Sequence, residues 1–141
     1  MQRAFIAVVI AAATLSLGRT GSAQTLTYKA RLAPMPVASA RDGITGLGSA
    51  TATLAGRSLS VRGTFDGMKS AATIAQIHLG PRGIRGPVMF DLKLTKGTSG
   101  TLIGTFTLTP EQVEAVKAGR FYIQVHSETA PDGNLWGWLL P

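Results

Sequence analysis

Apolar and polar residues alternate in short runs along most of this chain, and glycine and proline separate one run from the next. In residues 25–33, for example, an apolar side chain stands at every second position from Leu26 to Leu32. A period of two is typical of a strand that is buried on one face only. The pattern predicts eight short strands, over residues 25–33, 46–54, 58–65, 73–79, 88–94, 102–108, 121–126 and 135–140.

One helix is predicted between the sixth and seventh strands. Thr109 stands before Pro110, and Gln112 follows Thr109 by three residues. This is the pattern of a capping box with proline in the first turn, and Gly119 is expected to end the helix. Eight short strands and one short connecting helix predict an all-β fold, an antiparallel, Greek-key-like β-sandwich or flattened barrel of about eight strands.

The first 23 residues have the layout of a secretory signal peptide. Arg3 gives a positive start, residues 4–17 form an uncharged run of apolar or small side chains, and residues 21–23 offer small residues for cleavage. The run is shorter than the ~20 residues that a membrane-spanning helix needs, and an uncleaved anchor is the alternative interpretation. We therefore expect a cleaved signal peptide in residues 1–23, one domain without a transmembrane segment in residues 24–141, and a secreted or periplasmic location.

Composition excludes several kinds of site. The chain has 141 residues, no cysteine and two histidines. Disulfide bonds, cysteine-ligated zinc, iron–sulfur clusters and thiol nucleophiles are therefore excluded, and two histidines are too few for a three-histidine catalytic zinc site. No Gly-x-Ser-x-Gly motif marks a serine hydrolase, and we expect a protein that is not an enzyme.

The charge of the chain indicates a class of partner. The formal net charge is +7, and the lysines and arginines are scattered rather than gathered in one run. Such a surface favours anionic cell-surface polymers. The predicted export and the lack of a cluster of basic and aromatic residues argue against nucleic acid as the partner.

Two ordered motifs resemble the signature of the CHRD domain family. The first is AQIHLG in residues 75–80, followed by Gly83 and by GPV in residues 86–88; the second is AGRFYIQVHS in residues 118–127, followed by PDG in residues 131–133 and by Gly137. Gln76 stands where the family often has the first of two histidines. The resemblance runs from about Tyr28 to Leu140 and implies an immunoglobulin-like or superoxide-dismutase-like β architecture in an exported protein. It implies no mechanism, because the molecular function of the family is unknown.

Strand alternation places both histidines on polar faces. Gln76 and His78 alternate with apolar residues in one predicted strand, and Gln124 and His126 do so in another. If these strands pair in register, their polar side chains form one patch outside the core, with two carboxylates on the loop that follows. The full patch is Gln76, His78, Gln124, His126, Glu128 and Asp132.

Two interpretations of this patch stay open. In the first, His78 and His126 bind copper or zinc, with a carboxylate, a methionine sulfur or water completing the site. In the second, both histidines are structural and hydrogen-bond to backbone carbonyl groups where loops meet strands. The second interpretation requires no cofactor.

A second candidate surface combines aromatic and basic residues. Trp136 and Trp138 fall on one face of the last strand, and Arg82 and Arg85 stand in the glycine-rich loop of residues 80–86. The tryptophans either pack at an edge of the core or form a platform for a sugar or a partner protein. The arginines lie in solvent or contact an anionic ligand. We expect a non-enzymatic interaction module whose partner is a protein or a cell-envelope component, and the alternative is a copper- or zinc-binding protein.

Overall fold

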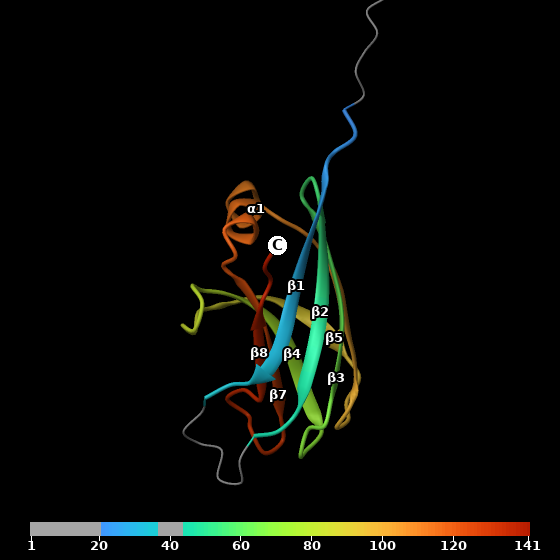
Figure 1. Ribbon diagram of the computed structural model, residues 1–141, viewed down its shortest axis with the longest axis vertical. Coiled ribbons are helices and arrows are strands. Elements are labelled where there is room, and N and C mark those ends of the chain that lie inside the picture. Colours follow the sequence, from blue (N-terminus) through green and yellow to red (C-terminus); the bar gives the residue numbers. More distant parts are fainter. Residues whose placement is uncertain (1–20, 37–43) are drawn as a thin grey trace, which may run out of the picture.

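The computed structural model describes residues 21–36 and 44–141, which form a barrel of eight antiparallel strands with one short helix (Figure 1). Residues 1–20, which hold most of the predicted signal peptide, lie outside the described residues. The elements are Thr25–Pro34 (β1), Leu47–Ala55 (β2), Ser58–Asp66 (β3), Ala72–Leu79 (β4), Val88–Leu94 (β5), Gly100–Thr107 (β6), Pro110–Lys117 (α1), Phe121–Ser127 (β7) and Leu135–Trp138 (β8). Each predicted element is therefore found, although β8 ends at Trp138 rather than at residue 140.

The strands follow a Greek-key-like order around the barrel. The order is β1-β2-β3-β6-β5-β4-β7-β8, and β8 pairs with β1 to close it. Because β3 lies beside β6 and β4 beside β7, the β3–β4 and β6–β7 connections pass neighbouring strands instead of forming hairpins. The predicted antiparallel all-β fold is confirmed, and of the two predicted architectures the barrel is the one that forms.

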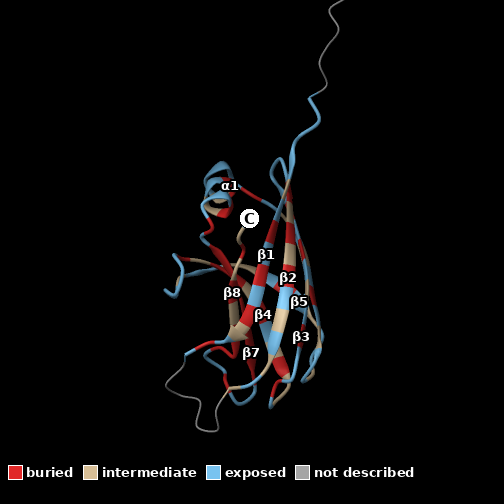
Figure 2. Ribbon diagram, viewed as in Figure 1, coloured by how far each residue is buried: buried red, intermediate tan, exposed pale blue. Residues whose placement is uncertain are grey.

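The core fills the barrel with the apolar residues of the alternating pattern. Along β1 and β3 in Figure 2, buried and exposed positions alternate as the sequence predicts. Leu32, Leu59, Ile77 and Phe121, from four different strands, are fully buried there. Burying such a side chain contributes about 1.5–3 kcal/mol, so this packing is the main stabilising term in a chain without disulfides.

The helix α1 lies at one end of the barrel and has the predicted caps (Figure 1). The Thr109 hydroxyl accepts a hydrogen bond from the Gln112 backbone amide at 3.2 Å, and the Gln112 side chain accepts one from the Thr109 amide at 2.9 Å. Val113 and Val116 are its buried residues. Among the described residues, no helix has the length and apolar character needed to cross a bilayer.

Candidate functional site

Every residue of strand β7 is buried, although only one face of the strand points into the barrel. Something must therefore cover its outer face. Phe121, Ile123 and Val125 belong to the barrel core. Tyr122 and Gln124 point to the outside, yet they are only 0% and 4% exposed. Loops from two places in the sequence, residues 80–87 and 128–134, make the hydrogen bonds on this face.

Gln124 and His126 hold the second of these loops. The Gln124 side-chain amide donates to the Asp132 carbonyl oxygen at 3.1 Å and to His126 Nε2 at 3.1 Å. His126 Nδ1 lies 2.7 Å from the Pro131 carbonyl oxygen. Because a carbonyl oxygen only accepts, Nδ1 carries the proton and Nε2 accepts from Gln124. Both ring nitrogen atoms of His126 are therefore engaged in hydrogen bonds, and together with Gln124 the ring holds residues 131 and 132 in place.

Two further buried residues complete the attachment of this loop, and neither is among the site residues predicted from the sequence. The Ser127 hydroxyl donates to Asn134 Oδ1 at 2.9 Å and accepts from the Ala130 amide at 3.2 Å. The Asn134 side-chain amide donates to the Thr45 carbonyl oxygen at 2.9 Å. Both side chains are almost completely buried, so the loop ends are held by satisfied polar groups rather than by apolar packing alone. The signal that could have found them is their position, with Ser127 immediately before the loop and Asn134 at its end.

His78 and Tyr122 hold the first loop at Gly86, because one side chain bonds its backbone carbonyl and the other its backbone amide. The Gly86 amide donates to the Tyr122 hydroxyl at 2.9 Å, and His78 Nδ1 donates to the Gly86 carbonyl oxygen at 2.9 Å. The two rings stack with their centroids 5.0 Å apart. A Cβ at position 86 would overlap the backbone oxygen of Leu79, so only glycine fits between these two side chains and β4. His78 Nε2 is buried and has no hydrogen-bond partner among the described residues.

The buried His78 ring is expected to make the free energy of unfolding depend on pH. Burial lowers the pKa of His78 below its ordinary value of 6.5; the hydrogen bond to Gly86 opposes this effect, and the charges of His126 and Arg85 add to it. Below pH 6.5 the unfolded chain therefore binds a proton that the folded state resists. We expect the free energy of unfolding to fall as the pH is lowered from 6.5 through the folded-state pKa, measured by urea unfolding at a series of pH values.

The matched variant for this prediction is His78→Gln, which retains a side-chain donor for the Gly86 carbonyl but does not titrate. Its free energy of unfolding should change less over the same pH range. An unchanged pH dependence in the variant would contradict the assignment of this effect to His78.

The two histidines stand at different levels of the β4–β7 ladder. His78 lies opposite Tyr122 in the β4–β7 ladder, and His126 stands four residues farther along β7, which places the two Cα atoms roughly 13 Å apart along the strand. A metal at His126 would have to displace the Gln124 amide from Nε2. No group of three or more histidine, cysteine or acidic residues in the described parts of the chain could hold a metal ion. Each ring makes a hydrogen bond through Nδ1 to a backbone carbonyl oxygen of a loop, and metal binding by the pair stays a prediction.

The remaining residues of the predicted patch make separate contacts. Gln76 lies opposite Gln124 but donates to Asp91 on β5 at 2.9 Å. Asp132 contributes its backbone carbonyl, and Glu128 is exposed on the loop. Arg85 donates to the same Asp132 carbonyl at 3.2 Å, so it ties the two loops together.

The tryptophans form an aromatic cluster with Tyr122 on the same outer wall. Trp136 and Trp138 meet edge to face with their centroids 4.8 Å apart, and Tyr122 lies 4.6 Å from Trp138. The Trp138 indole donates to the Gly80 carbonyl oxygen at 2.9 Å. Both tryptophans are half-buried, so each combines a packed edge with an accessible part.

A cleft of about 550 Å³ lies beside these tryptophans, over the seam where β8 meets β1. Lys29 and Arg31 of β1 line it together with Trp136 and Trp138, and Arg82 of the first loop also lines it. No carboxylate is among its described lining residues. We call this the seam cleft. It unites three of the four residues predicted as an interaction surface, adds two cations from β1, and leaves Arg85 outside.

Comparison with known proteins gives one match. The model of the CHRD domain family matches residues 13–139, which is nearly the whole chain. No curated protein and no solved structure matches significantly.

Proposed function

This chain belongs to the CHRD domain family, and from that premise we propose that it is a non-enzymatic, exported binding module for an anionic polysaccharide of the cell envelope. The observation that carries the proposal is the seam cleft, where three cations and two tryptophans line one hollow without a carboxylate. The indole faces can pack against sugar rings, and the cations can pair with the acidic groups that such polymers carry.

The remaining chemistry of the outer wall supports binding rather than catalysis. Both histidines and the Gln124 amide hold loops, so the polar residues of the two family motifs have structural partners. One of the loops held in this way carries Arg82 to the tryptophans. The motifs therefore build and fix a surface, which is what a binding module requires.

The polysaccharide proposal can be tested with polygalacturonate and its neutral methyl ester. We expect the purified protein to bind the acidic polymer and not the ester in isothermal titration calorimetry, because cations dominate the cleft. Arg31→Ala combined with Arg82→Ala should weaken binding about tenfold, since both side chains are exposed in the cleft. Added salt should weaken it further.

A matched control distinguishes binding at the cleft from nonspecific attraction to the positive charge of the whole protein. Lys96→Ala removes one charge from the turn between β5 and β6, outside the cleft. It should leave the affinity within about twofold of the original. Equal weakening by Lys96→Ala and by Arg82→Ala alone, or equal binding of the acidic polymer and its ester, would contradict the proposal.

A further inference from the structure

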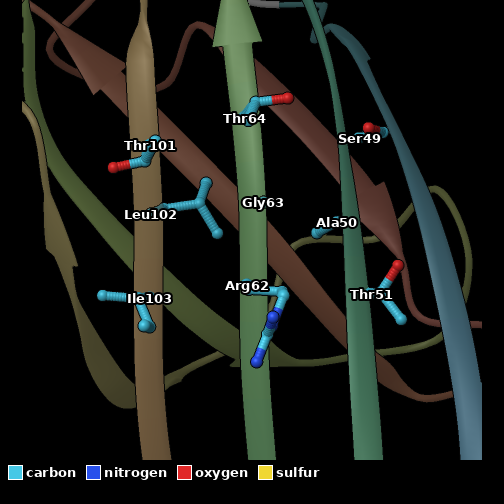
Figure 3. A pocket seen from close by; sticks show the side chains of 9 residues that line it. All are labelled: Ser49, Ala50, Thr51, Arg62, Gly63, Thr64, Thr101, Leu102 and Ile103. Atoms are coloured by element: carbon cyan, nitrogen blue, oxygen red, sulfur yellow. The ribbon is translucent and has the colours of Figure 1, made fainter.

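A second hollow lies next to the seam cleft, on the outer wall formed by β2, β3 and β6. Its volume is about 530 Å³. Figure 3 shows the side chains in it: Arg62 stands between Thr51 and Ile103, and Thr64 stands between Ser49 and Thr101. We call this the sheet hollow. Its polar lining is hydroxyl groups and one guanidinium, and no described carboxylate lines it.

The two hollows are parts of one track that runs across the strands. Ser49 lines both. The strand register aligns Arg31 with Ser49, Ser49 with Thr64, and Thr64 with Thr101. The track from β8 across β1, β2 and β3 to β6 covers four strand spacings, or about 19 Å at ~4.8 Å each.

A parallel row carries the charges along the same track. Lys29 lies opposite Thr51, Thr51 opposite Arg62, and Arg62 opposite Ile103. Lys29 and Arg62 are therefore two strands apart, and both are exposed. Lys29 and Arg62 are therefore too far apart for one sugar unit to contact both. The hydroxyl group of Thr51 lies between them.

We propose that the ligand is a linear, uronate-bearing polysaccharide that crosses the sheet and occupies the seam cleft and the sheet hollow together. This inference rests on the proposed function and specifies its ligand. The tryptophans offer faces on which sugar rings can stack, and cations line the same cleft. This arrangement suits a polymer whose negative charge is carried on the sugar ring. Beyond β1 the track offers hydroxyl and guanidinium groups and no aromatic platform among its lining residues, which suits sugar hydroxyls and carboxylates rather than nucleic acid bases.

Oligogalacturonates of defined length test whether one chain fills both hollows. A disaccharide is too short for a track of about 19 Å, whereas an octasaccharide spans it. We expect the octasaccharide to bind at least about tenfold more tightly than the disaccharide, because the second hollow is reached at high effective concentration. Arg62→Ala should weaken octasaccharide binding about fivefold and leave disaccharide binding unchanged, whereas Arg82→Ala should weaken both.

The outcomes separate this inference from the proposed function. If both oligosaccharides bind equally, or if Arg62→Ala has no more effect than Lys96→Ala, the seam cleft binds alone and the extended track is wrong. If neither oligosaccharide nor the polymer binds, the proposed function fails with it. Tight binding of poly(glycerol phosphate) or of oligodeoxythymidylate, at an affinity equal to that of the octasaccharide, would overturn the assignment of a uronate polysaccharide.

Discussion

Gly137→Ala is expected to destabilise the barrel by about 3 kcal/mol or more and to abolish polysaccharide binding. Gly137 lies in β8, where a Cβ would overlap the backbone oxygen of Arg31 and stand 3.0 Å from Leu32 Cδ2. The backbone of β1 cannot rotate away as a flexible side chain could, so β8 would have to leave the seam. Its tryptophans and the cleft would move with it. Urea unfolding and calorimetry with polygalacturonate measure the two effects.

The control for this variant is Gly97→Ala, in the turn between β5 and β6. The nearest atom to a Cβ there is the Ser99 oxygen at 3.1 Å, within the same turn, so the turn can adjust. We expect a change of about 0.5 kcal/mol or less. Equal stability of Gly137→Ala and the original protein would show that the seam is not packed as closely as the structure has it.

Tyr122→Ala is expected to cost about 3–5 kcal/mol, as large as the loss of a core aromatic residue. Tyr122 is fully buried, although it points away from the barrel core. It stacks on His78, contacts both tryptophans and accepts the Gly86 amide. Its removal would empty the space beneath the cleft and release the first loop, so binding should be lost together with stability.

Tyr122→Phe divides this effect into its two parts. The ring and its stacking remain, and only the hydroxyl that receives the Gly86 amide is lost. We expect a loss of about 1–2 kcal/mol and nearly unchanged polysaccharide binding. A loss as large as that of Tyr122→Ala would mean that the hydrogen bond, rather than the ring, supports the outer wall.

The fold could be predicted from the sequence because its determinants are local. The period of two in each strand, the turn glycines and the Thr109 capping box are properties of neighbouring residues, and each gave an element at the right place. The choice between sandwich and barrel could not be made, because it depends on whether β8 reaches β1. That contact joins the two ends of the described domain.

The candidate site was predictable only in part, because it too depends on contacts between residues that are far apart in the sequence. Alternation correctly placed Gln124 and His126 on the outer face of β7, but it could not say that loop carbonyl groups would occupy their polar atoms. Trp136 and Trp138 could be paired from sequence. Lys29 and Arg31 could not be added to them, because these cations stand far away in the chain and reach the tryptophans only when the barrel closes.

The closure between β1 and β8 is narrow. β1 pairs with β2 from Thr25 to Leu32, whereas its ladder with β8 holds only Ala33 and Pro34, with one further bridge from Lys29 to Leu140. If β8 detached, both β1 and β7 would present free edges, and free edges invite strand pairing between molecules. A polymer that contacts both β1 and β8 would oppose their separation. A bound polysaccharide of the kind proposed would therefore also protect the protein from aggregation.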